Sequence, residues 1–183
     1  MSTNVYLQAR LSSTRLPSKV LKKLGNKTIL EIIVERTKRI KNVDNVILVT
    51  GDKSKNKSIV DVAKKLELKY FCGNEINVLD RFHEASKLFP SDKIIRITCD
   101  NPLIDPKLIN QGLEIFLKNN LDILSNDRIP TFPYGLNFEI FRKSALNKSW
   151  KENKSKFSNE ADFYSQSLSP VIYMLNNDNF INY

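Results

Sequence analysis

Short apolar runs alternate with amphipathic segments along the first two thirds of the chain. Apolar, β-rich runs predict strands, and apolar residues at intervals of three and four predict helices. The predicted strands cover residues 5–7, 45–50, 69–72 and 93–98. The predicted helices cover residues 28–40, 59–66, 78–88 and 105–116. Strands and helices that alternate in this way are typical of βαβ units, so we predict a mostly parallel sheet with helices on both faces.

The last third of the chain has a less regular pattern. Strands are predicted at residues 121–124 and 136–141, joined by a polar loop at 126–134, and helices at 145–154 and 160–168. The apolar run 171–175 is followed by a polar, Asn-rich stretch. Nothing in this stretch closes an element or caps a helix.

Length and composition indicate one globular domain. The chain has 183 residues, of which 41% are hydrophobic and 27% charged, so residues 1–183 are expected to form a single domain. No apolar run approaches the ~18 residues of a membrane span, and the N-terminus does not resemble a secretory signal. Cys72 and Cys99 lie in no metal-binding pattern. We therefore expect reduced thiols, a cytoplasmic protein and no membrane partner.

The formal net charge of +9 predicts affinity for an anionic partner. By itself it does not choose between nucleic acid, a membrane surface and a phosphorylated metabolite. The lysines are scattered along the chain, which favours a solvated basic surface. Because no helix-turn-helix, RNP or zinc-finger pattern is present, no nucleic-acid partner is expected.

Ligands of parallel sheets bind beyond the carboxyl ends of the strands, and a basic segment lies at one such end. Residues 8–19 follow the first predicted strand and place Arg10, Arg15 and Lys19 among Ser and Thr hydroxyls. Cations and backbone N–H groups together suit a polyphosphate. The segment lacks the Walker A pattern, and an exposed basic loop without a ligand is the alternative.

An aspartate follows the predicted strand 93–98. Asp100 in this position can hold Mg²⁺, which takes one or two protein carboxylates plus phosphate oxygens; the alternative is a turn-capping aspartate. Asp105 is expected to cap the next helix, with Pro106 at its first position. His83 is expected on the solvated face of the helix 78–88.

Four blocks, in this order, resemble the cytidylyltransferases of surface-sugar biosynthesis. They read QARLSSTRLPSKVL, GNEINVLDR, RITCDNPLIDPKLI and SNDRIPTFPYGLNFEIF. The first is similar to the family pattern QARxxSTRLPGKxL, with Ser18 in place of the usual glycine. The resemblance covers about residues 4–142. Its closest branch is the spore-coat-polysaccharide type, related to the enzymes that activate 3-deoxy-manno-octulosonate and sialic acid.

The resemblance implies an α/β fold: a three-layer α/β/α Rossmann-like sandwich of the nucleotide-diphospho-sugar transferase type. It implies transfer of CMP from CTP to an acidic or amino sugar, with pyrophosphate released and Mg²⁺ as cofactor. The homodimer common in the family is the assembly it implies.

The resemblance also assigns roles to individual residues. Those expected to contact the nucleotide, chiefly its phosphates, are Ala9, Arg10, Ser13, Arg15 and Lys19. Arg81 is expected on the base or sugar side, and Asp100 is expected to bind Mg²⁺. The charges of Arg10, Lys19 and Asp100 are expected to carry catalysis.

Several positions depart from the family pattern. Tyr134 and Asn137 stand where the family has the acidic residues of YPDGLD, and residues 159–162 lack the histidine of a Glu-Arg-Glu-His segment. A family block DTxED, which supplies a second aspartate on the metal side, has no counterpart before Tyr183. The chain is therefore expected to lack the C-terminal segment of the family. A truncated or degenerate homologue that binds nucleotide or a partner protein without turnover stays as the alternative.

Overall fold

The computed structural model describes residues 2–12, 16–127 and 132–182. Its strands are β1 (Thr3–Gln8), β2 (Lys23–Leu24), β3 (Lys27–Thr28), β4 (Asn45–Thr50), β5 (Lys69–Cys72), β6 (Lys93–Thr98), β7 (Ile123–Ser125) and β8 (Glu139–Arg142). Its helices are the 3-10 helix η1 (Lys19–Leu21) and α1 (Ile29–Thr37), α2 (Lys57–Lys65), α3 (Val78–Leu88), α4 (Pro106–Lys118), α5 (Lys143–Lys154), α6 (Glu160–Ser165) and α7 (Ile172–Leu175).

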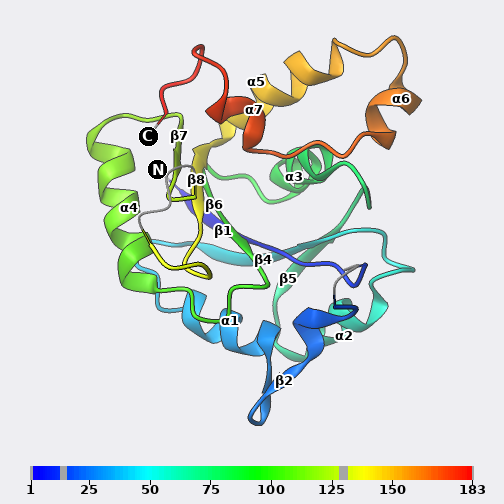
Figure 1. Ribbon diagram of the computed structural model, residues 1–183, viewed down its shortest axis with the longest axis vertical. Coiled ribbons are helices and arrows are strands. Elements are labelled where there is room, and N and C mark those ends of the chain that lie inside the picture. The colour runs from blue at the N-terminus through cyan, green and yellow to red at the C-terminus, as the bar shows by residue number, and fades with distance from the viewer. Residues whose placement is uncertain (1, 13–15, 128–131, 183) are drawn as a thin grey trace.

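Six strands form the central sheet in the order β5-β4-β1-β6-β8-β7 (Figure 1). The four strands from β5 to β6 are parallel, and β8 is antiparallel to both β6 and β7. The predicted mostly parallel sheet is therefore confirmed, with an antiparallel pair at one side. Strands β2 and β3 form a separate small hairpin, whose turn holds Gly25 at a positive φ of 64°.

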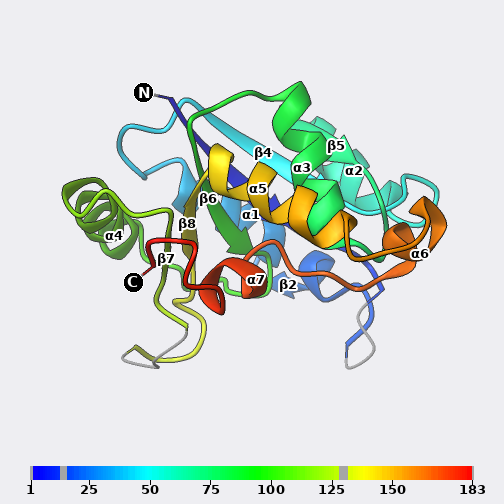
Figure 2. The same cartoon turned by 90° about the horizontal axis from the view of Figure 1, so that it is seen from above.

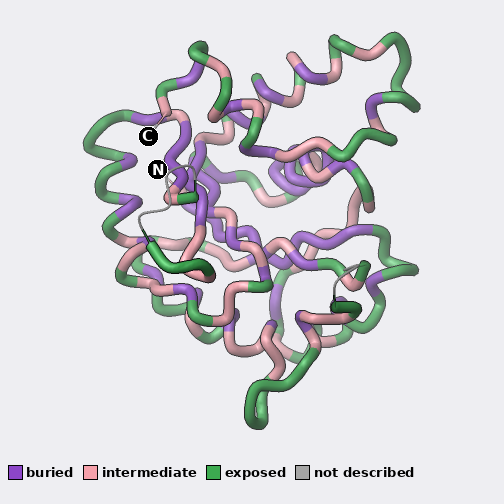
Figure 3. Tube along the Cα trace, viewed as in Figure 1, coloured by how far each residue is buried: buried purple, intermediate pink, exposed green. Residues whose placement is uncertain are grey.

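Side chains that alternate along β1 enter two different cores, because successive residues of a strand point to opposite faces. Val5 and Leu7 pack with apolar residues of α1, α2 and α4. Tyr6 packs on the opposite face with apolar residues of α3, α5 and α7. The two helical layers enclose the sheet (Figure 2), and buried segments run through the centre of the molecule (Figure 3). The three-layer α/β/α sandwich is thus confirmed.

Two predicted local features are present. Asp105 caps α4 by accepting a hydrogen bond from the backbone N–H of Lys107, and Pro106 occupies the first turn. Cys72 and Cys99 are free thiols, and burial raises the pKa of both. Within the described ranges, no helix combines the length and the apolar character needed to cross a membrane.

Some predicted boundaries are wrong. The helix expected at residues 28–40 ends at Thr37, and its first residue is the cap: Thr28 and Glu31 form a capping box. The strand expected at 136–141 begins only at Glu139, because the side chain of Asn126 bonds the backbone of Leu136 and Phe138 and keeps them in a loop.

Two helices also differ from their predicted bounds. The helix expected at 145–154 begins two residues earlier, at Lys143. The helix expected at 160–168 ends at Ser165, because Gln166 is extended. The carbonyl of Leu168 instead accepts the backbone N–H of Leu79 at the start of α3.

The segment after residue 170 forms a helix that the sequence did not predict, and this helix has no side-chain cap at its start. Residues Ile172–Leu175 form α7, and Met174 and Phe180 are buried against the sheet. The backbone N–H groups of Asp122 and Ile123 both donate to the carbonyl of Ile181. The strand predicted at 121–124 forms instead at Ile123–Ser125. Contacts with distant residues of the sheet therefore hold residues 172–181 in place, although the local sequence contains no helix cap.

Truncating a central aromatic residue should destabilise the fold strongly. Phe82 on α3 is fully buried, with its ring centroid 5.6 Å from that of Tyr6 and 6.4 Å from that of Phe141. Phe82→Ala should lower the free energy of unfolding by about 3–5 kcal/mol, measured by urea denaturation. Leu88→Ala on the same helix is the control, because Leu88 is 62% exposed. Similar losses in both variants would contradict this packing.

Candidate functional site

The carboxyl ends of β1, β4, β5 and β6 meet at one edge of the sheet, because these strands are parallel and neighbouring. The loops that leave them therefore lie together there. These loops begin at Ala9, Gly51, Gly73 and Cys99. Two of them contain the segments in which the sequence predicts phosphate and magnesium binding.

The loop after β1 is anchored at its first residues. Ala9 is buried, and its N–H donates to the carbonyl of Val49. Arg10 is exposed. The N–H of Leu11 donates to Oδ1 of Asn56 at 2.9 Å. The predicted nucleotide contacts Ser13 and Arg15 lie outside the described residues.

The structure brings Lys19 and Asp100 together, although they are 81 residues apart in the chain. Lys19 Nζ lies 3.1 Å from Asp100 Oδ2, with the two side chains 30% and 43% exposed. Burial opposes ionisation of Asp100, but hydrogen bonds from Lys19 and Thr98 outweigh it and lower the pKa of the carboxyl. An ammonium and an ionised carboxylate thus face each other at the edge of the sheet where ligands are expected.

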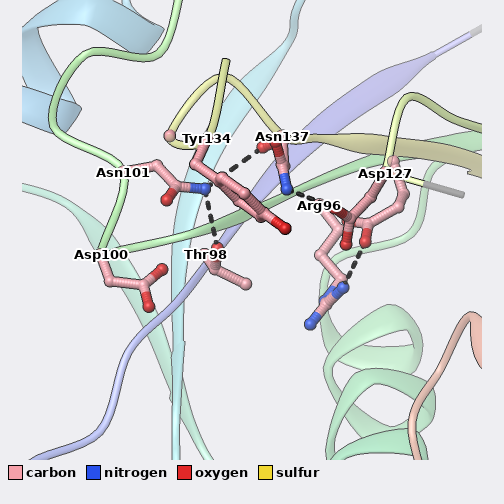
Figure 4. A pocket seen from close by; sticks show the side chains of 9 residues that line it. Arg96, Thr98, Asp100, Asn101, Asp127, Tyr134 and Asn137 are labelled. Atoms are coloured by element: carbon pink, nitrogen blue, oxygen red, sulfur yellow. Dashed lines mark hydrogen bonds and ion pairs between the residues drawn. The ribbon is translucent and has the colours of Figure 1, made fainter. Parts of the chain in front are cut away.

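Beside Asp100 lies a polar pocket of about 270 Å³. It is lined by Arg96, Thr98, Asp100, Asn101, Asp127, Tyr134, Gly135, Asn137 and Glu139. Figure 4 shows the labelled side chains on the end of β6 and the turn that follows it, on the chain after β7 and on the loop before β8. Glu139 is the first residue of β8. Asn137 donates to the Asp127 carboxylate, and Asn101 donates to Thr98 Oγ1 at 3.1 Å. The pocket therefore offers both hydrogen-bond donors and hydrogen-bond acceptors next to the Lys19–Asp100 pair.

Two residues that line this pocket, Arg96 and Glu139, form an ion pair that sequence reasoning missed. Arg96 Nη1 lies 2.7 Å from Glu139 Oε1, and Arg96 Nε donates to Gln8 Oε1 at 2.8 Å. Burial raises the pKa of Glu139, and Arg96 opposes this shift. Glu139 in FEIF and Arg96 in KIIRIT are each flanked by apolar residues within a predicted strand. That pattern is the signal from which the pair could be found.

Removing the arginine should make stability depend more strongly on pH. Arg96→Met leaves the Glu139 carboxylate buried without a cation, which costs about 3–5 kcal/mol. Glu139 then folds with a pKa further above its ordinary value of 4.5. A carboxyl with a raised folded pKa contributes stability that is lost as pH rises. The free energy of unfolding, measured by urea denaturation, should therefore fall more steeply above about pH 4.5 than in the wild type.

The double variant Arg96→Met/Glu139→Gln is the matched control for that prediction. It removes the titrating carboxyl along with its partner, so the additional pH dependence should disappear. An identical pH slope in Arg96→Met and the wild type would contradict the coupling of these two side chains.

Arg81, a predicted contact on the base or sugar side, is fully buried. Its Nη1 donates to the carbonyls of Asn74 at 2.6 Å and Glu75 at 3.3 Å. Its Nε and Nη2 have no hydrogen-bond partner within the described part of the chain. Burial lowers the pKa of Arg81 to about 10, and the positive charges of Arg10 and Arg96 act in the same direction. The structure thus places Arg81 against the backbone of the loop after β5.

His83 does not lie on a solvated helix face, so that expectation is wrong. The ring is buried and stacks on Trp150, with centroids 4.1 Å apart and planes inclined by 14°. Burial, together with the charge of Lys87, lowers the pKa of His83. The helical pattern could not show this, because α5, which supplies Trp150, covers the histidine only in the folded chain.

No group of three or more His, Cys, Asp or Glu side chains arranged for a metal occurs within the described ranges.

Comparison with known proteins assigns the chain to a family. The family described as cytidylyltransferase matches residues 5–181. An uncharacterized protein of Methanocaldococcus jannaschii is 43% identical over 167 residues, which are 91% of this chain and 65% of that protein. The spore coat polysaccharide biosynthesis protein SpsF of Bacillus subtilis is 39% identical over 120 residues, 63% of this chain and 50% of that protein.

A 3-deoxy-manno-octulosonate cytidylyltransferase of Trichlorobacter lovleyi is 34% identical over 121 residues, 65% of this chain and 46% of that enzyme. The chain thus spans about half to two thirds of the length of these three curated relatives. Among solved structures, a cytidylyltransferase from Leptospira borgpetersenii superposes with a TM-score of 0.85 at 31% identity. That match covers 100% of this chain and 74% of the other. Together with the family match over almost the whole chain, these likenesses confirm the resemblance seen in its four blocks: the chain belongs to the cytidylyltransferase family.

Proposed function

We propose that this chain transfers CMP from CTP to a sugar and releases pyrophosphate. The observation that carries the proposal is the contact between Lys19 and Asp100, which joins the basic loop after β1 to the carboxylate after β6 beside a polar pocket. The relatives support the choice of substrates, since one is named for the transfer of a cytidylyl group to 3-deoxy-manno-octulosonate and another for polysaccharide biosynthesis.

The chemistry asks the protein for positioning and charge rather than for a covalent intermediate. A sugar hydroxyl attacks the α-phosphorus of CTP and forms a new O–P bond. The bond between the α-phosphorus and the oxygen that bridges it to the β-phosphorus breaks, so that this oxygen leaves with pyrophosphate. The hydroxyl proton passes to solvent. Negative charge builds up on the phosphate oxygens and on the departing pyrophosphate. Arg10, which is exposed, and Lys19 are the cations from the loop that would stabilise this charge.

The residues present fit a magnesium ion held jointly with the nucleotide. Asp100 offers a partly exposed carboxylate whose lowered pKa keeps it ionised. Mg²⁺ takes one or two protein carboxylates and completes its shell with phosphate oxygens and water. When bound, it would neutralise phosphate charge and orient the triphosphate. Lys19 would then shift its contact from Asp100 to the phosphates.

The pocket beside Asp100 is the place we assign to the sugar. Its volume of about 270 Å³ suits one sugar ring, and its lining is mostly polar. Asn101, Asn137 and Asp127 supply amide and carboxylate groups that can bond hydroxyls. An acidic or amino sugar is the class that we propose.

Pyrophosphate release tests this proposal. The full chain is incubated with CTP, Mg²⁺ and a panel of acidic, amino and neutral sugars, and pyrophosphate is measured with each. Release that depends on both CTP and one class of sugar is expected. Thermal stabilisation by CTP without any release would favour a non-catalytic nucleotide-binding homologue. Salt-sensitive retention on DNA with no effect of CTP would contradict both functions.

A further inference from the structure

One carboxylate connects three of the loops at the ligand-binding edge of the sheet. Glu75, in the loop after β5, accepts a hydrogen bond from Ser12 Oγ on its Oε1 at 2.8 Å. Its Oε2 accepts from the backbone N–H of Asp52 at 3.0 Å and from Nδ2 of Asn56 at 2.8 Å. Both oxygens of Glu75 are therefore occupied by donors from the loops after β1 and β4.

Asn56 extends this network to the backbone of the loop after β1. It is fully buried, and its Oδ1 accepts the N–H of Leu11 at 2.9 Å. Its Nδ2 donates to the carbonyl of Asp52 at 2.9 Å as well as to Glu75. A buried amide whose two ends are both used holds its neighbours in a defined position, because each lost hydrogen bond would leave a buried polar group unsatisfied.

Gly51 and Arg81 both contribute to the position of Glu75. A Cβ atom on Gly51 would lie 1.8 Å from Glu75 Oε2, so only glycine allows the carboxylate to approach the chain there. Arg81 Nη1 donates to the backbone carbonyls of Asn74 and Glu75 from within the core. Arg81 thus holds the backbone of the loop that carries Glu75, and the side chain of Glu75 contacts the loop after β1.

We infer that Glu75 and Asn56 are positioning residues for nucleotide binding: they hold the loop after β1 in the conformation that receives the triphosphate. The inference rests on the proposed function for the identity of the ligand. It differs from a general stabilising role, because the contacts converge on Leu11 and Ser12, within the segment that contains Arg10 and Lys19. Their loss should weaken CTP binding more than it affects the sugar pocket, whose lining contains neither residue.

Glu75→Gln is the variant that tests this. Glutamine has the same size but no charge: its amide group can turn toward Ser12 Oγ, which can accept, while the remaining oxygen accepts from Asp52 and Asn56 without the strength that the carboxylate charge gives. Because charge-assisted hydrogen bonds are roughly twice as strong as neutral ones, the Kd and KM for CTP should rise roughly 10-fold. The KM for the sugar should change less than about threefold. In the protein without nucleotide, hydrogen exchange at the Leu11 amide should become faster.

Two further variants keep the test decisive. Ser12→Ala removes only the contact from the loop to Glu75, and it serves if Glu75→Gln does not fold. Glu160→Gln is the matched control, since Glu160 is an exposed surface carboxylate on α6 whose Oε1 lies 2.6 Å from Lys154 Nζ. It should leave CTP binding and Leu11 exchange unchanged.

The outcomes separate the inference from the proposed function. Unchanged CTP affinity and unchanged Leu11 exchange in Glu75→Gln, with a wild type that binds CTP, would overturn the inference alone. Equal increases in the KM for CTP and for the sugar would also overturn it, because they indicate a merely structural role. A wild-type chain that binds no CTP would overturn the proposed function, and the exchange measurement, which needs no nucleotide, would still decide whether Glu75 holds the loop.

Discussion

Lys19→Ala should lower the rate of pyrophosphate release from CTP roughly 10²–10³-fold, as the loss of a donor to a developing oxyanion does in other enzymes. The Lys19 ammonium lies at the edge of the sheet where phosphates are expected and contacts the partly exposed Asp100. Because the pair is not deeply buried, its loss should change the free energy of unfolding little. The rate is measured by pyrophosphate release at saturating CTP, and stability by urea denaturation.

Lys27→Ala is the control for this prediction. Lys27 lies on the β3 strand of the small hairpin and pairs with Glu35 at the surface. The control removes the same charge from the chain, so it separates a local role of Lys19 from the effect of net charge. Unchanged kinetics in Lys19→Ala, or an equal loss in both variants, would remove Lys19 from the proposed mechanism.

Asp100→Asn should have a comparable effect on turnover and should change its dependence on magnesium. Asparagine keeps the shape of the side chain but lacks the charge and the carboxylate oxygens that Mg²⁺ prefers. We expect a loss of roughly 10²-fold at a fixed Mg²⁺ concentration, on the scale of other lost transition-state charges. The Mg²⁺ concentration that gives half-maximal rate should rise. Calorimetric titration of CTP with and without Mg²⁺ provides a second readout, in which the stimulation by Mg²⁺ should shrink.

The chain offers a close control for Asp100 five positions further on. Asp105 caps α4 through its side chain, and asparagine caps helices about as well as aspartate. Asp105→Asn should therefore leave both turnover and the magnesium titration unchanged. If Asp100→Asn responded to Mg²⁺ as the wild type does, the proposed metal contact would be wrong.

Elements whose stability is local were predictable from sequence. Residues 45–50 form β4 and residues 93–98 form β6 as expected, because runs rich in β-branched residues suit strands of a covered sheet. The Asp105–Pro106 pair marked the start of α4 correctly, since capping depends on neighbouring residues alone.

Features that depend on distant contacts were missed. The burial of His83 requires Trp150 from a helix 67 positions later in the chain, and the place of α7 requires the sheet beneath it. Likewise, nothing near Glu75 in the sequence indicates that its carboxylate bonds Ser12 and Asn56. A helical or strand period reports which face of an element is apolar, but it does not report which other element covers that face.

By itself, the sequence determined the alternation of strands and helices, the basic segment after the first strand and the acid after the strand at 93–98, because each depends on residues close together in the chain. Only the tertiary structure decided that Lys19 reaches Asp100, that Arg96 and Glu139 pair beneath the pocket, and that Glu75 joins three loops. The physical reason is the sheet: its parallel strands bring their carboxyl ends to one edge, and antiparallel β8 places its first residue, Glu139, opposite Arg96 of β6, so charges from distant segments meet.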